Sequence, residues 1–374
     1  MQKILVYADN AATTQLDSDA FEAMKPYLLS DFGNASQPYS FARSPKMALR
    51  ESRQIIASCI NAEPDEIYFT SGGTESDNWA IKGIAFASQS RKTTITSAFE
   101  HHAVLRACNA IERLGWPVAY LSPTVDGIIE PGDLEAIIAP STALVSVMMS
   151  NNEIGTVQPI RELCHIAHKN GALFHTDAVQ AVGHIPVDVK ELDIDLLSAS
   201  AHKFNGPKGV GFLYIKKGVS IAPLIDGGSQ EYGYRAGTEN VASIIGMAVS
   251  FKNNCVKLKE NMARIVELEN ELLNALDDYQ ISYVRNGKGR TIPGNLSLSF
   301  VGHEGESLLH RLDLMGIQVS TGSACDSKST QISHVLQAIR TDETVARGTI
   351  RISLGKESSL EDVGRIAAAL KRIL

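Results

Sequence analysis

The sequence predicts an α/β fold with a mainly parallel sheet, followed by a smaller α+β region. Between about residues 15 and 250, β-rich runs alternate with helical patterns, which is the order of strand–helix–strand units. Some of the strand-like runs are continuously apolar, as between Ala143 and Met149, and such strands are buried on both faces of a sheet. The length of 374 residues predicts two or three domains.

The elements of the alternating region follow in order. Residues 18–29 and 43–60 are expected to be helices, the second because its apolar residues recur at helical spacing. Strands are then expected at residues 67–70, 93–97, 118–121, 143–149, 173–177, 196–200 and 210–215. The helices between them are expected at residues 71–87, 101–114, 132–138 and 160–170, the last ending at the helix breaker Gly171.

The remainder of the chain has a different pattern. One long helical pattern runs from residue 241 to about residue 276. Strand-like runs follow at residues 296–300, 316–320 and 349–354, and a last helix starts at Ser359. We therefore expect a large domain over residues 15–250 and a small domain formed by residues 1–14 and 251–374.

Charge and composition exclude several classes of function. The chain has 35 basic and 42 acidic residues and a net charge of −7, so it has no basic excess for binding a nucleic-acid backbone. No run of 18 apolar residues could span a membrane, and the first residues lack the layout of a signal peptide. The five cysteines are widely spaced without a CxxC motif, which argues against disulfides and zinc and predicts a cytoplasmic protein.

Polar residues gather just after the predicted strands, where open α/β sheets bind ligands. Gly72 and Gly73 precede a helix and suit a phosphate, although an ordinary helix cap has the same pattern. Lys203 follows a strand end and is either a surface charge or an amine that forms a Schiff base. The other polar residues at these positions are His101, Asn152, Asp177, Gln180, Ser200 and His202. Together these groups are the set that pyridoxal phosphate requires: a lysine, a carboxylate, and donors for its phosphate.

The order of these motifs resembles the cysteine desulfurases of the NifS/IscS type, a branch of the class-V aminotransferase family. The resemblance is carried by residues 9–14, 70–78, 151–155, 175–180, 200–203, 235–240 and 320–325. It implies the pyridoxal-phosphate-dependent transferase fold type I. In that fold, a large domain holds a mainly parallel seven-stranded sheet between helices, next to a smaller α+β domain. It implies pyridoxal 5'-phosphate as the cofactor and no metal ion.

The resemblance also implies roles for individual residues. Lys203 would bind the aldehyde of the cofactor, Asp177 would pair with its ring nitrogen, and His101 would stack on the ring and act as an acid or base. The remaining cofactor ligands would be Asn152 and Gln180 beside the phenolic oxygen, and Gly73, Thr74, Ser200 and His202 at the phosphate.

Two further assignments concern the substrate and the partner subunit. Arg351 would bind the substrate carboxylate, with Asn34 beside it, because a guanidinium matches a carboxylate. Thr238 would reach the phosphate of the other subunit, which implies a homodimer. A sulfur-acceptor protein is implied as a second partner, such as an iron–sulfur scaffold or a tRNA thiolase.

Cys325 is the cysteine that the resemblance makes catalytic. It lies in a stretch of small and polar residues, about 320–331, that we expect to be a mobile loop. The other four cysteines lie in apolar helical contexts and are expected to be packed thiols. The implied reaction converts L-cysteine to L-alanine: Lys203 removes the α-proton, and the Cys325 thiolate attacks the substrate sulfur and becomes a persulfide.

The sequence departs from the family pattern at Ala35, Tyr39 and Tyr232, where proline, histidine and arginine are common. We expect the Tyr232 change to alter substrate access or partner contact. The chain ends just after its last helix, which puts docking of an iron–sulfur scaffold by a C-terminal extension in doubt. The alternative function is a selenocysteine lyase or another small class-V enzyme, and Cys325 favours the desulfurase because transamination needs no such nucleophile.

Overall fold

The computed structural model describes residues 5–321 and 332–374. Its centre is a seven-stranded sheet in which every strand except β8 runs in the same direction. Across the sheet the strands lie in the order β2 (Ile67–Thr70), β8 (Gly211–Ile215), β7 (Leu196–Ser200), β6 (Leu173–Asp177), β5 (Thr142–Ser146), β3 (Thr93–Ser97) and β4 (Val118–Leu121). The predicted α/β fold with a mainly parallel seven-stranded sheet is confirmed.

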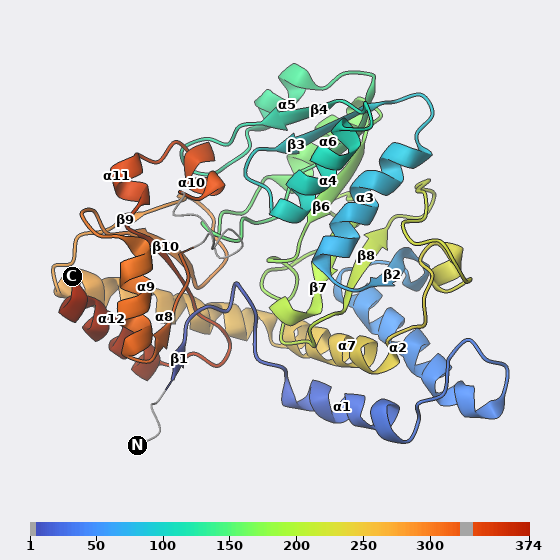
Figure 1. The fold of residues 1–374 in the computed structure, drawn as a ribbon, viewed down its shortest axis with the longest axis horizontal. Helices are drawn as coiled ribbons and strands as arrows, with labels where there is room; N and C mark the ends of the chain where they lie inside the picture. The colour runs from blue at the N-terminus through green and yellow to red at the C-terminus, as the bar shows by residue number, and fades with distance from the viewer. Residues whose placement is uncertain (1–4, 322–331) are drawn as a thin grey trace.

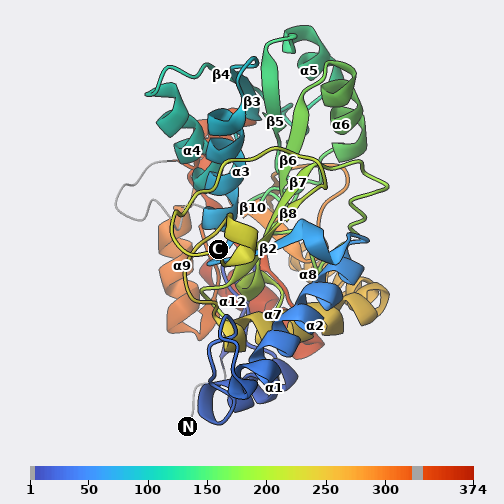
Figure 2. The same ribbon diagram turned by 90° about the vertical axis from the view of Figure 1, so that its right-hand side faces the viewer.

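Helices cover both faces of this sheet (Figures 1 and 2). They are α1 (Ser18–Leu29), α2 (Arg43–Cys59), α3 (Gly73–Ala87), α4 (His102–Glu112), α5 (Pro131–Ile137), α6 (Ile160–Lys169) and α7 (Val241–Val256). Successive residues of β5 enter different apolar clusters: Leu144 packs in the cluster that contains α3 and α4, and Val145 packs in the cluster that contains α6. This alternation explains why consecutive residues of β5, Ala143 to Val145, are apolar and buried.

The long helical pattern after residue 241 is two helices, so the prediction of one helix is wrong. α7 ends at Val256, and α8 (Leu258–Asp278) begins after Lys257, whose ψ of 10° departs from helical geometry. α7 packs against α1 and α2, whereas α8 packs against α12 (Leu360–Ile373). Both halves have helical periodicity, and only their packing against different neighbours separates them.

The second region has its own apolar core. Its strands form a three-stranded antiparallel sheet in the order β12 (Thr349–Ser353), β10 (Asn295–Ser299) and β9 (Val284–Arg285), and a parallel pair of β1 (Val6–Tyr7) with β11 (Ile317–Gln318). Its further helices are α9 (Gly305–Leu314), α10 (His334–Ala338) and α11 (Glu343–Ala346). β1 carries the N-terminal segment to this region, at the left of Figure 1.

The division into a large domain over residues 15–250 and a small domain over residues 1–14 and 251–374 remains a prediction. Val6 and Ala8 belong to the core of the second region, in line with grouping residues 1–14 there. Val335 and Leu336 of α10, however, pack in the core of the large sheet. Apolar packing therefore crosses the proposed boundary at α10.

Within residues 5–321 and 332–374, no helix combines the length and the apolar character needed to cross a lipid bilayer.

Candidate active site

The carboxyl ends of β2, β3, β5, β6 and β7 meet at one edge of the sheet, and a cavity of about 290 Å³ opens there. Its size is near the lower end of the range for small-molecule sites. The predicted residues that line it are Gly73, Thr74, His101, Asn152, Asp177, Gln180, Ser200, His202, Lys203 and Arg351. The parallel strands bring together lining residues from Gly73 to Lys203, and β12 of the second region adds Arg351.

One end of the cavity lies at the start of a helix, a position that suits an anion. α3 begins at Gly73, and the N–H groups of its first turn have no partner within the helix. Gly72 has a φ of +146°, and a Cβ placed on Gly73 would lie 2.6 Å from Val179 Cγ2, so both positions favour glycine. The Ser200 hydroxyl and the His202 ring also line this cavity. Burial lowers the pKa of His202 to about 4, so the ring is neutral near pH 7.

Two buried carboxylates lie at the inner side. Asp177 ends β6, and its Oδ1 accepts a hydrogen bond of 2.9 Å from Val179 N. Asp77, on the buried face of α3, is 1% exposed, and its Oδ1 has no hydrogen-bond partner among the described residues. Burial raises the pKa of Asp177 to about 6, and burial together with the Asp177 charge raises the pKa of Asp77 further above its usual range. We infer that a cation brought to this position would be strongly stabilised.

The distances among three side chains of the cavity would also allow a metal ion to bind. Ligand atoms of Asp77, His101 and Asp177 all lie within 4.8 Å of one another. Two buried carboxylates can instead share a proton, and their raised pKa values favour that arrangement.

His101 and Lys203 lie together in the cavity. His101 precedes α4 and its Nδ1 accepts a hydrogen bond of 3.1 Å from Ala103 N, so the proton of the neutral ring is on Nε2. Burial and then the nearby Lys203 charge lower the pKa of His101 to about 4. The Lys203 Nζ donates to Ala11 O at 2.6 Å and to Ala12 O at 2.8 Å, which ties it to the N-terminal segment.

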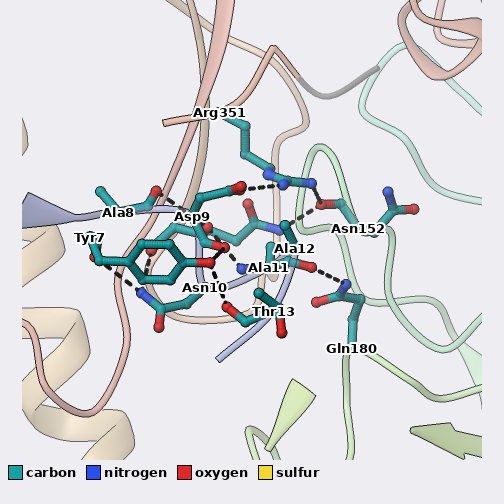
Figure 3. Close-up of polar contacts among 12 residues, drawn as sticks. Tyr7, Ala8, Asp9, Asn10, Ala11, Ala12, Thr13, Asn152, Gln180 and Arg351 are labelled. Carbon is teal, nitrogen blue, oxygen red and sulfur yellow. Dashed lines mark hydrogen bonds and ion pairs between the residues drawn. The ribbon is translucent and has the colours of Figure 1, made fainter. Parts of the chain in front are cut away.

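Arg351 comes from β12 and is 4% exposed. Its Nη2 contacts Asp9 Oδ1 at 2.6 Å and its Nη1 donates to Asn152 O at 2.9 Å, so the guanidinium lies between the N-terminal segment and the large sheet (Figure 3). Gln180 Nε2 donates to Ala11 O at 2.9 Å in the same view. The geometry combines a fixed cation, a lysine amine, a neutral imidazole and an anion-binding helix end.

Similarity to known proteins identifies the family of this chain. Residues 6–366 match the family model described as aminotransferase class-V. The chain belongs to the class-V aminotransferase family.

Relatives within the class-V family are similar over nearly the whole chain. The cysteine desulfurase IscS of Dictyoglomus turgidum is 50% identical over 99% of this chain and 94% of its own length. The cysteine desulfurase NifS of Azotobacter vinelandii is 41% identical over 96% of this chain and 90% of its own. A solved NifS-like protein has a TM-score of 0.93 at 36% identity, covering 99% of both chains. A structure described as SspA in complex with cysteine has a TM-score of 0.85 at 35% identity, covering 95% of this chain and all of its own.

Two predicted residues that the structure describes, Thr238 and Asn34, do not line the cavity of this class-V chain. Thr238 is exposed outside it, and Asn34, in the loop between α1 and α2, uses its Oδ1 to accept a hydrogen bond from Ser36 N. The structure therefore does not bring Asn34 to Arg351 within one chain. Cys325 lies outside the described residues.

The sequence reasoning missed Asp77, Asp9 and the segment at Ala11 and Ala12. Asp77 had one signal: it is a charged residue among the apolar positions of α3 that face the sheet, beside Trp79 and Ala80. Asp9 begins a motif that was recognised, but its contact with Arg351 joins residues 342 positions apart and has no local signal.

Proposed function

We propose that this protein is a cysteine desulfurase, which converts L-cysteine to L-alanine and holds the released sulfur as a persulfide on Cys325. The observation that carries the proposal is the meeting of Lys203, Asp177 and Arg351 in one cavity of a class-V aminotransferase chain. Relatives named cysteine desulfurase, up to 50% identical over nearly the full length, support the choice of reaction. The motif around Cys325 supports it from the sequence.

Pyridoxal phosphate fits the residues present. The two buried carboxylates Asp77 and Asp177 suit a protonated ring nitrogen, and the start of α3 suits a phosphate. We propose that the phosphate is held by Gly73, Thr74, Ser200 and His202, and the ring by Asp177, Gln180, Asn152 and His101. Lys203 would hold the aldehyde carbon. When bound, the cofactor supplies an electron sink for the pair left behind when a proton leaves the substrate.

The protein's own residues then have distinct tasks. Arg351 binds the substrate carboxylate and fixes the orientation of the amino acid. The Lys203 amine, held beside Ala11 O and Ala12 O, takes the proton from the substrate α-carbon. His101 is neutral and carries a proton on Nε2, so it can give or accept one near the reacting sulfur.

The sulfur step is assigned to Cys325. Its thiolate attacks the substrate sulfur, the carbon–sulfur bond of cysteine breaks, and the new sulfur–sulfur bond leaves a persulfide on Cys325. The carbon that loses sulfur gains a proton, which gives alanine. The thiolate must stay reduced, which supports the expected reducing cytoplasm.

The test is release of alanine and sulfide from L-cysteine, with a reductant present, by the wild type and three variants. We expect Lys203→Ala and Cys325→Ser to lose both products, whereas Cys59→Ser, at a partly exposed thiol outside the cavity, keeps them. Full sulfide release by Cys325→Ser would reject the persulfide assignment. Failure of the wild type to form alanine from L-cysteine would reject the function.

We also propose a homodimer in which Thr238 completes the phosphate site of the partner subunit, because Thr238 is exposed outside the cavity of its own chain. Large apolar side chains on and between α1 and α2 are exposed, as expected of a surface that a second copy covers. They are Phe21, Leu28, Leu29, Phe32, Tyr39, Phe41 and Met47. A sulfur-acceptor protein, such as an iron–sulfur scaffold or a tRNA thiolase, would take the persulfide sulfur.

A further inference from the structure

Arg351 is held by a carboxylate of its own chain. Its Nη2 lies 2.6 Å from Asp9 Oδ1, a charge-assisted contact, and the Arg351 side chain is 4% exposed against 20% for Asp9 (Figure 3). Asp9 does not line the cavity, whereas Arg351 does. The carboxylate therefore supports the guanidinium from outside the space that a ligand would occupy.

Asp9 is itself placed by backbone contacts. It forms a bridge with Ser353, two residues along β12 from Arg351, and Ser353 Oγ accepts a hydrogen bond of 2.9 Å from Ala11 N. Asp9 O accepts from Ala12 N at 3.0 Å and from the Tyr7 hydroxyl at 3.1 Å. The segment from residue 7 to residue 12 is thus a hydrogen-bonded turn against β12.

The same turn reaches both cations of the cavity. Its Asp9 side chain contacts Arg351, and its carbonyl groups at Ala11 and Ala12 accept hydrogen bonds from Lys203 Nζ. The spacing between the lysine amine and the guanidinium is therefore set by one short stretch of backbone.

The guanidinium keeps donors for a ligand. An arginine side chain has five N–H donors. Nη1 donates to Asn152 O, Nη2 to Asp9, and the buried Nε has no hydrogen-bond partner within the part of the chain that the structure describes. A buried, unpaired N–H is costly, and a ligand carboxylate is the kind of group that would satisfy it.

We propose that Asp9 is the positioning residue for Arg351: it holds the guanidinium at the distance and orientation at which the carboxylate of the amino-acid substrate is bound. This proposal rests on the proposed function, because it takes an amino acid as the ligand. An oxygen acceptor at this position is sufficient for the positioning, and the negative charge of Asp9 itself weakens the attraction of a second carboxylate to Arg351.

The test uses the holoenzyme and two substitutions at one position. Asp9→Ala removes the acceptor, so we expect about tenfold weaker binding of L-alanine by calorimetry and a rise of about tenfold in KM for L-cysteine, with kcat within about twofold. Asp9→Asn keeps an oxygen acceptor and loses the charge, so it should bind L-alanine at least as tightly as the wild type. Binding of L-alaninamide, which has no carboxylate, should be the same in all three proteins.

Asp17→Asn is the matched control. Asp17 also pairs with a cation of the second region, Lys356, at 2.7 Å, but neither residue lines the cavity, and asparagine caps α1 as well as aspartate does. We expect no change in L-alanine binding. This control separates a general loss of contact between the two regions from a loss at Arg351.

The outcomes separate this proposal from the proposed function. If wild type binds L-alanine and Asp9→Ala binds it equally well, the positioning role is rejected and the desulfurase proposal stands. An equal weakening of L-alaninamide, or a fall in kcat without a change in KM, also rejects it. If the wild-type holoenzyme neither binds L-alanine nor acts on L-cysteine, both proposals fail.

Discussion

Glu100 is a fully buried carboxyl group just behind the cavity. It accepts hydrogen bonds from the Ser97 hydroxyl and from Met148 N, the latter at 2.9 Å, and burial raises its pKa from 4.5 to about 8. The folded protein therefore keeps a proton that the unfolded chain releases near pH 4.5, and the stability that this proton contributes is lost as the pH rises through about 8.

Glu100→Gln should remove the pH dependence of stability that comes from the Glu100 carboxyl group. We expect the free energy of unfolding of the variant, relative to wild type, to rise by about 2–4 kcal/mol between pH 5 and pH 8, measured by urea unfolding of the holoenzyme. Buried groups that do not interact with Glu100 titrate equally in both proteins and cancel in the difference. Glu135→Gln, at an exposed position with 61% of its side chain accessible, is the control and should show no such change. An identical stability difference at both pH values would contradict the pKa of Glu100.

The thiols of the described residues differ in environment. Cys108 and Cys164 are buried, and burial raises the pKa of both, that of Cys108 to about 12. Cys59 and Cys255 are only partly buried but pack against the core of the large sheet, so all four thiols are packed as expected and two of them are fully buried. A hydrogen bond from Cys255 lowers the pKa of Cys59.

The rate at which each thiol is alkylated should follow its accessibility and its pKa. With iodoacetamide at pH 8 in the native protein, we expect Cys59 to be modified at least tenfold faster than Cys108 or Cys164, because only the thiolate reacts and it must be accessible. Peptide mass spectrometry at a series of times measures the rates. Modification of Cys108 at the rate of Cys59 would show that its burial does not protect it.

At the residue level, the order of the sequence motifs predicted most of the residues that line the cavity. The residues that it identified follow strand ends, and a parallel sheet gathers strand ends at one edge. Asp77 and Asp9 were missed because their importance comes from contacts: Asp77 faces Asp177 across two elements, and Asp9 meets Arg351 through the pairing of β1 and β12 regions. Such contacts have no local sequence signal.

At the scale of elements, the loop that carries Thr238 is anchored by a buried ion pair. Arg53 of α2 donates to both Glu231 oxygens, at 2.8 and 2.7 Å, and its guanidinium lies 4.3 Å from the centre of the Phe69 ring. Glu231 and Tyr232 have φ values of 45° and 60°, left-handed conformations that cost about 1 kcal/mol or more each. The ion pair offsets this strain and fixes the loop seven residues before Thr238. Tyr232, whose change from arginine was expected to alter partner contact, stacks beside the Arg53 guanidinium at 5.3 Å.

Arg53→Met should destabilise the protein by about 3 kcal/mol, because it leaves the Glu231 carboxylate buried without its cation. The measurement is urea unfolding at pH 7. Lys190→Met is the control: it breaks an ion pair with Glu63 whose side chains are 51% and 59% exposed, and should destabilise the protein far less than Arg53→Met. Equal effects of the two substitutions would contradict the anchoring role of Arg53.

The elements themselves were predicted well where a periodic pattern is long. The strands of the large sheet and its helices lie within a few residues of the expected positions. Short elements such as β1, β9 and α11 were missed, since two to four residues have no measurable period and form only against a partner. The break at Lys257 was missed because helical periodicity continues across it.

At the scale of the whole molecule, the exposed apolar side chains on and between α1 and α2 are unusual for a monomer. Phe32 and Phe41 pack edge to face at 5.1 Å and remain 68% and 47% exposed. We propose that a second copy covers them in the dimer in which Thr238 completes the partner's phosphate site.

Leu29→Asp should weaken the dimer. Leu29 is 76% exposed, and a carboxylate there would be buried in the interface, so we expect the dimer dissociation constant to rise at least about tenfold by analytical ultracentrifugation. Leu114→Asp, 70% exposed beyond the end of α4, should leave it unchanged. A wild type that is monomeric at micromolar concentration, or an unaffected Leu29→Asp dimer, would contradict this interface.

The central claim is that this cavity removes sulfur from L-cysteine and passes it to Cys325. The most direct measurement is peptide mass spectrometry of the holoenzyme after one turnover with L-cysteine and without reductant. We predict that the peptide containing Cys325 gains the mass of one sulfur atom in step with alanine formation, and that Lys203→Ala shows neither change. Alanine formation with no added sulfur on that peptide, or with the sulfur on another cysteine, would contradict the account.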